Sequence, residues 1–183
     1  KSANLEPQQD IISSLIPRAM IIGGGVAGMS AAVSMAEMGM EVVLIEKTSE
    51  LGGLLRTIHR IGPSGIPAQD RIEALHQSII QNPNITLYTS AQVKHVGGYI
   101  GNYIVTLENS EQQTLQEEVG CIVVATGAVP LQPKGKFGYD GHKVITQIEL
   151  ENLLKQGDFK AQRVVMIQCV GARDQEREYC SRI

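Results

Sequence analysis

The sequence predicts an α/β fold in which helices cover a parallel β-sheet and an antiparallel β-meander is inserted between parallel strands. Three apolar runs, at residues 19–22, 42–45 and 121–124, are continuous, which is typical of parallel strands buried on both faces. Between the second and third runs lie short alternating segments separated by glycine and asparagine, which indicates antiparallel strands. A glycine-rich turn and an Ala/Met-rich helical pattern follow the first run, as expected for a strand-to-helix unit.

The glycine-rich turn has the spacing Gly23-x-Gly25-x-x-Gly28, which is the spacing of a dinucleotide-binding turn. In such a turn Gly23 permits the sharp bend, Gly25 leaves room for a pyrophosphate, and Gly28 lets the helix pack closely on the sheet. The free N–H groups at the start of that helix would face the phosphates. A glycine turn without any ligand has the same pattern, so its surroundings must decide between the two interpretations.

The second strand, at residues 41–46, ends in Glu46, where a dinucleotide-binding fold places the carboxylate that holds a ribose. The pair Gly52-Gly53 follows, and it is either a plain turn or a close backbone approach to a flat ligand. Residues 60–67 contain two Gly and two Pro and are predicted to form a loop. An amphipathic helix is predicted at residues 68–80.

Four strands follow, at residues 85–89, 92–96, 103–107 and 114–119, and they contribute the predicted meander. The next buried strand starts at Cys121, a predicted core thiol, and ends in Ala125-Thr126-Gly127. These small residues are either a plain strand end or a place where a cofactor approaches the backbone.

The C-terminal part begins with a Gly/Pro/Lys-rich linker at residues 131–142. Thr146 and Glu149 form a capping-box pattern that opens a helix ending at Gly157. Residues 163–168 are predicted to form another buried strand, but no second glycine fingerprint follows it. We therefore expect a dinucleotide-binding domain at residues 1–131 and a linker with the truncated beginning of a second domain at residues 132–183, in a chain excised from a longer protein.

Composition narrows the function classes. A net charge of −3, an aromatic content of 4% and the absence of Trp predict no nucleic-acid partner. No apolar run approaches the roughly 20 residues of a membrane-spanning helix. Three irregularly spaced cysteines do not form a disulfide framework, which predicts a reducing, cytoplasmic setting.

Taken together, these motifs resemble the FAD-binding layout of two-dinucleotide-domain flavoproteins, the superfamily of thioredoxin reductase and the small glutamate synthase component. Residues 167–174 (IQCVGARD) and 179–182 (YCSR) further resemble the A subunit of heterodisulfide reductase and its relatives. In that family a flavin-dependent protein passes electrons between FAD and iron–sulfur clusters and works with other subunits of a redox complex. The resemblance therefore implies an FAD-dependent oxidoreductase whose isolated fragment is inactive.

The resemblance also implies site residues. Gly23, Gly25, Val26, Ala27 and Gly28 would contact the pyrophosphate, and Glu46, with Lys47 beside it, would bind the adenosine ribose. Gly53 and Leu54 would lie toward the flavin, Val93 would contact adenine, and Ala125, Thr126 and Gly127 would close over the cofactor. Cys169 and Cys180 would be two thiolate ligands of a 4Fe–4S cluster, completed only in the full-length parent.

Some features depart from the superfamily. No cysteine directly follows Gly52-Gly53, so the redox disulfide of the glutathione reductase type is absent. No Cys-x-x-Cys is present either, so the redox disulfide of thioredoxin reductase is also absent. We nominate no catalytic acid or base, because the flavin carries the chemistry. Three alternatives stay open: a pyridine-nucleotide-dependent flavoprotein reductase of the glutamate synthase small-subunit type, an NAD-dependent enzyme with a single Rossmann site, and a non-catalytic nucleotide-binding assembly module.

Overall fold

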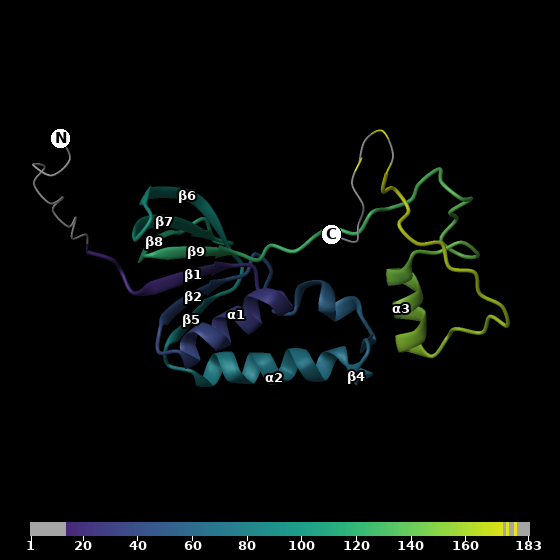
Figure 1. The fold of residues 1–183 in the computed structure, drawn as a ribbon, viewed down its shortest axis with the longest axis horizontal. Helices are drawn as coiled ribbons and strands as arrows, with labels where there is room; N and C mark the ends of the chain where they lie inside the picture. Colours follow the sequence, from purple (N-terminus) through teal and green to yellow (C-terminus); the bar gives the residue numbers. More distant parts are fainter. Residues whose placement is uncertain (1–13, 174, 176–177, 179–183) are drawn as a thin grey trace, which may run out of the picture.

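The computed structural model describes residues 14–173, 175 and 178, which form three layers followed by a C-terminal segment (Figure 1). The central layer is a parallel sheet in the order β5-β2-β1-β9. Its strands are β1 (Arg18–Ile22), β2 (Glu41–Ile45), β5 (Ile85–Tyr88) and β9 (Cys121–Val124). The parallel sheet predicted from the continuous apolar runs is thus confirmed.

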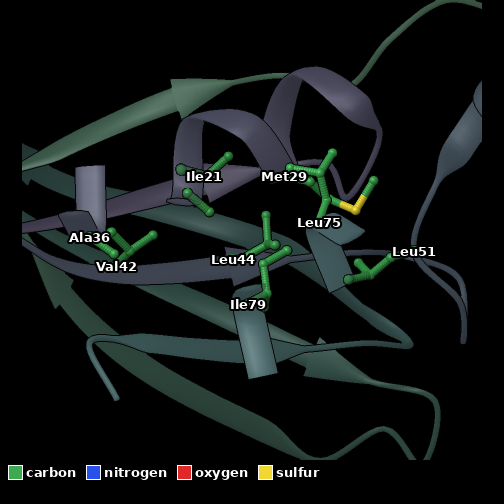
Figure 2. Close-up of a cluster of buried hydrophobic side chains, with 9 residues drawn as sticks. Ile21, Met29, Ala36, Val42, Leu44, Leu51, Leu75 and Ile79 are labelled. Carbon is green, nitrogen blue, oxygen red and sulfur yellow. The ribbon is translucent and has the colours of Figure 1, made fainter. Parts of the chain in front are cut away.

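Two helices, α1 (Val26–Glu37) and α2 (Ala68–Gln81), cover one face of this sheet. Because side chains alternate along a strand, Ile21, Val42 and Leu44 point toward the helices. There they meet a stripe of helical residues that includes Met29 of α1 and Leu75 of α2, and Leu51 closes the cluster from a loop (Figure 2). The amphipathic helix expected at residues 68–80 is confirmed, with Ala68, Ile72, Leu75 and Ile79 buried.

The meander covers the other face. It consists of β6 (Ala91–Tyr99), β7 (Asn102–Asn109) and β8 (Thr114–Val119), paired antiparallel in that order. Met20, Val43 and Ile45 point to this side of the parallel sheet and pack against apolar side chains of the meander, Ala91, Val105, Leu107 and Val119. The inserted meander is therefore confirmed, and its first predicted strand, β5, belongs to the parallel sheet instead.

A polar network joins the meander to the sheet. Glu117 of β8 is buried, 7% exposed, and its carboxylate accepts hydrogen bonds from Arg18 of β1 and, at 2.7 Å, from the Tyr88 hydroxyl of β5. Burial, together with the hydrogen bond to the Glu117 carboxylate, raises the pKa of Tyr88 to about 12.

A short helix and a two-stranded ladder were not predicted. A 3₁₀-helix, η2 (Gly53–Thr57), follows the second glycine pair, and the expected loop at residues 60–67 contains a small antiparallel ladder of β3 (Arg60–Ile61) and β4 (Ile66–Pro67). Neither has an apolar period long enough to be recognised in sequence.

The C-terminal segment, residues 132–173, contains the helix α3 (Gln147–Gln156). The predicted capping box is confirmed: the Thr146 side chain accepts from Glu149 N–H, the Glu149 carboxylate accepts from Thr146 N–H, and Gly157 closes the helix. The strand predicted at residues 163–168 is wrong. These residues form no regular element and are exposed, because no neighbouring strand in the described part of the chain pairs with them.

A cavity of about 1090 Å³ lies within this segment, between α3 and the irregular chain on either side of it. Its lining comes entirely from residues 131–172, so it lies apart from the glycine turns. None of the helices in the described residues has the length and apolar character needed to cross a bilayer.

Candidate functional site: a glycine cradle at the carboxyl edge of the sheet

The predicted binding segments meet at one edge of the parallel sheet. The first glycine turn follows β1, Glu46 follows β2, and residues 125–127 follow β9. Since β1 pairs with both β2 and β9, all three segments lie side by side at the carboxyl ends of the strands. This edge is where open α/β sheets bind ligands.

Two glycines of the first turn are required by the fold itself. Gly23 has a φ of 114°, and a side chain there would overlap the carbonyl of Ala125. A side chain at Gly28 would overlap the carbonyl of Gly23. The tight turn expected at Gly23 and the close packing expected at Gly28 therefore both have a direct steric cause.

Gly25 differs from both. A Cβ added there would meet no heavy atom within 4 Å, so the space in front of it is open. Gly25 is also the N-cap of α1, where no side chain caps the helix and no acidic residue lies in the first turn. The first N–H groups of a helix have no acceptor within the helix. Open space in front of an uncapped helix start fits an anion.

The second glycine pair packs directly against the first turn. Gly52 N–H donates to the Gly24 carbonyl at 2.8 Å, and Gly25 and Gly52 form an isolated parallel bridge. Leu51 anchors this loop because its side chain fills the core beside Met29 and Leu75 (Figure 2). Gly53 stays exposed at the open side of the cradle.

The Glu46 carboxylate is buried, 7% exposed, and is held by backbone from two loops. Its Oε2 accepts from Gly24 N–H at 2.7 Å, and its Oε1 accepts from Thr48 N–H at 2.8 Å and from the Thr48 hydroxyl at 2.9 Å. The acid predicted to bind a ribose is thus positioned beside the glycine turn, and it also links the turn to the loop after β2.

The other predicted residues lie at different distances from this cradle. Ala125 N–H donates to the Ile22 carbonyl at 2.8 Å, which places the strand end beside Gly23, whereas Thr126 and Gly127 are exposed. Lys47 and Leu54 are exposed on the loops that flank Glu46 and Gly53. Val93 lies in β6, where its half-buried side chain packs against the meander cluster. Val26 and Ala27 are exposed at the start of α1.

Of the two predicted iron–sulfur ligands, the structure describes Cys169 alone. Cys169 is exposed, and Cys180 lies outside the described residues. Within the part of the chain that the structure describes, no three His, Cys, Asp or Glu side chains are grouped so as to hold a metal. Cluster ligation therefore stays a prediction.

Sequence reasoning missed three contacts that build the cradle. Gly24 supplies the N–H that fixes Glu46, Gly52 pairs with Gly25, and Thr48 holds Oε1 of Glu46. Gly24 and Gly52 stand beside predicted positions in glycine-rich stretches, which is a usable signal. The only sequence signal for Thr48 is its place two residues after Glu46, where a hydroxyl can form a local hydrogen bond with the carboxylate.

Fold and site together define a Rossmann-like domain with an inserted meander. A family model described as pyridine nucleotide-disulphide oxidoreductase matches residues 17–169, and the chain belongs to this family. Among solved structures, the L-proline dehydrogenase from P. horikoshii has a TM-score of 0.56 at 23% identity, covering 69% of this chain and 25% of that one. At this identity the likeness shows the fold alone.

Curated relatives match the whole chain. The iron-sulfur A subunit of a CoB–CoM heterodisulfide reductase from Methanopyrus kandleri is 26% identical over 275 residues, covering 100% of this chain and 42% of that protein. The A subunit of the H(2):CoB-CoM heterodisulfide,ferredoxin reductase from Methanothermobacter marburgensis has the same identity and coverage. The chain thus spans 42% of the length of these two relatives. The resemblance to the heterodisulfide reductase A subunit, which short motifs indicated, is confirmed.

Proposed function

We propose that this chain is the dinucleotide-binding part of a flavin-dependent electron-transfer oxidoreductase and that its glycine cradle binds FAD. The observation that carries this proposal is the open space at Gly25, in front of the uncapped start of α1 and beside the fixed carboxylate of Glu46. A pyrophosphate needs the first feature and a ribose hydroxyl needs the second.

Most of the predicted residues then have a direct role in holding the cofactor. The N–H groups of Val26, Ala27 and Gly28 donate to pyrophosphate oxygens, and Glu46 accepts from the ribose. Exposed residues of the neighbouring loops face the rest of the cofactor; these are Lys47, Gly53, Leu54, Thr126 and Gly127. The β6 backbone at Val93 contacts adenine. A bound flavin supplies the hydride and electron chemistry, while these residues bind and orient it.

A titration of the chain with FAD, ADP and NAD⁺, followed by calorimetry, tests the proposal. ADP is included because it is the half of FAD that the cradle and Glu46 would hold. Both FAD and ADP are expected to bind, because the cradle would make the same contacts with ADP and with the ADP half of FAD. NAD⁺ is expected to bind more weakly than FAD. A chain that binds neither FAD nor ADP, or that prefers NAD⁺ to FAD, contradicts the proposal.

We further propose that, in a protein of the relatives' length, the flavin exchanges electrons with iron–sulfur clusters and that other subunits of a redox complex take part. The support is the name of the Methanopyrus relative, an iron-sulfur subunit, together with the cysteines of the matched C-terminal segment. Cys169 and Cys180 would be two of the four thiolates that a 4Fe–4S cluster requires.

Iron–sulfur reconstitution of that longer protein tests the cysteines. Cys169→Ala is expected to reduce the cluster absorption and its EPR signal, because a cluster with three thiolates is less stable. Cys121→Ala is the matched control, since Cys121 lies half-buried in β9. A Cys169→Ala protein with a full cluster signal would remove Cys169 from the ligand set.

A further inference from the structure

Thr48 holds one of the two oxygens of the Glu46 carboxylate. Its N–H and its hydroxyl both donate to Glu46 Oε1, at 2.8 and 2.9 Å. The hydroxyl also lies 2.9 Å from the Glu50 carbonyl, but it has a single hydrogen and can donate to one acceptor at a time. A hydrogen bond to an ionised carboxylate is the stronger of the two, so the hydroxyl donates to Glu46.

Thr48 also ties this carboxylate to the start of the meander. Its carbonyl accepts from Ser90 N–H at 2.9 Å, and the Glu46 carbonyl accepts from Ala91 N–H at 3.0 Å. Thr48 therefore connects the loop after β2 to Ser90, the residue before β6.

The hydrogen-bond capacity of Glu46 limits what a ligand can add. An ionised carboxylate offers about four acceptor positions. Gly24 N–H, Thr48 N–H and the Thr48 hydroxyl occupy three of them, and the carboxylate is 7% exposed. The remaining acceptor position, on Oε2, can take one hydrogen-bond donor from a ligand.

We propose that Thr48 is a positioning residue for the ribose of an adenine nucleotide, acting through Glu46. Its hydroxyl helps to hold Oε1, and this fixes the carboxylate in the orientation in which the second acceptor position of Oε2 can take one ribose hydroxyl. The carboxylate then does not have to be ordered when the nucleotide arrives. This inference rests on the proposed function, because it takes the cradle to bind the ADP half of FAD.

The test compares ADP with 2′-deoxy-ADP and 3′-deoxy-ADP on wild type, Thr48→Val and Thr48→Ser. Wild type is expected to bind ADP about tenfold more tightly than one of the two deoxy nucleotides, because that nucleotide lacks the hydroxyl that donates to the charged Glu46 carboxylate. Thr48→Val removes only the hydroxyl donor and is expected to weaken ADP binding by about fivefold and to reduce that discrimination. Thr48→Ser keeps the hydroxyl and is expected to restore both.

Two controls keep the outcome unambiguous. Ser49→Ala changes the adjacent exposed hydroxyl and is expected to leave binding unchanged. Thr48→Ala repeats the measurement if Thr48→Val does not fold. Wild type that binds neither FAD nor ADP contradicts the proposed function, whereas a wild type that binds ADP, with Thr48→Val showing the same affinity and discrimination, overturns this inference alone. An equal loss for all three nucleotides also overturns it, because a general structural defect would give that result.

Discussion

At the residue scale, Gly25 and Gly28 lie three positions apart in one motif, but Gly25 leaves space for a ligand whereas Gly28 is required by backbone packing. An added side chain at Gly25 enters open space, whereas one at Gly28 overlaps the Gly23 carbonyl. We therefore expect Gly25→Val to lose FAD and ADP binding while unfolding at nearly the wild-type denaturant concentration, with a cost of about 1 kcal/mol from the changed N-cap. Calorimetric titration and urea unfolding measure the two effects separately.

Gly28→Val is the matched comparison for that experiment. Because its side chain meets backbone, it is expected to lower the free energy of unfolding by about 3 kcal/mol or more. A Gly25→Val chain with wild-type affinity for ADP would show that the pyrophosphate does not lie at Gly25.

The Tyr88–Glu117 hydrogen bond gives stability that depends on pH. The pKa of Tyr88 is raised from 10.0 to about 12 in the folded chain, so the folded chain holds this proton more tightly than the unfolded chain does. The contribution is fully present below pH 10.0 and is lost as the pH rises through about 12.

Tyr88→Phe is expected to cost about 1–2 kcal/mol of unfolding free energy at neutral pH, because it removes the hydroxyl donor of a buried carboxylate. The difference from wild type should shrink as urea unfolding is repeated between pH 10 and 12. Tyr99→Phe, at a tyrosine that is 65% exposed, is the control and should change neither value. A difference that stays constant across this pH range would contradict the linkage.

The sequence predicts the positions of Gly23, Gly25, Gly28 and Glu46 but not how these residues interlock. Motif spacing indicates which residues face a ligand, because that spacing follows from strand and helix geometry. It does not indicate that Gly24 N–H and Thr48 occupy the Glu46 carboxylate, because those contacts depend on how two loops meet in space.

At the element scale, the elements that the sequence predicts correctly are those that bury a continuous or periodic apolar pattern. The strands β1, β2 and β9 and the helix α2 are recognisable because both their pattern and their partners lie within this chain. The segment at 163–168 has an apolar run like that of β2, yet it forms no strand. A parallel strand is stabilised by its neighbours, and none pairs with this segment in the described residues.

The contact of α3 with the cradle loops is polar. The Glu151 carboxylate accepts from His59 N–H at 2.8 Å, and the Lys155 ammonium lies 3.4 Å from the Arg56 carbonyl, at the end of η2. No residue of α3 is buried. We therefore expect Glu151→Ala to loosen α3 from η2 without unfolding the three layers.

Hydrogen–deuterium exchange measures this directly. In Glu151→Ala the His59 amide should exchange faster, by about tenfold for the loss of one hydrogen bond to a carboxylate, while amides of β1 and β2 stay protected. Asn152→Ala, at the adjacent exposed position, should leave His59 unchanged. Unaltered exchange at His59 in Glu151→Ala would mean that this contact does not hold the helix.

At the scale of the whole molecule, the chain divides into a well-buried part and a weakly buried part. The three layers share the core clusters, and the cradle lies at their edge. The C-terminal segment contributes none of the buried core residues among those described. The boundary predicted at residue 131 falls between these parts and stays a prediction of domain organisation.

The exposed run from Val164 to Ile167 has a consequence for solution behaviour. Its side chains are 52%, 88%, 62% and 51% exposed, and a contiguous exposed apolar segment readily associates with another chain. We expect the purified chain to bind a hydrophobic dye and to self-associate with rising concentration.

Val165→Lys should reduce both effects while changing the free energy of unfolding by no more than about 0.5 kcal/mol, since the side chain is 88% exposed. Val129→Lys, at an equally exposed valine outside the run, separates the effect of the apolar segment from that of added charge. Light scattering and dye fluorescence measure the outcome, and equal reductions in the two variants would show that net charge, rather than the segment, governs association.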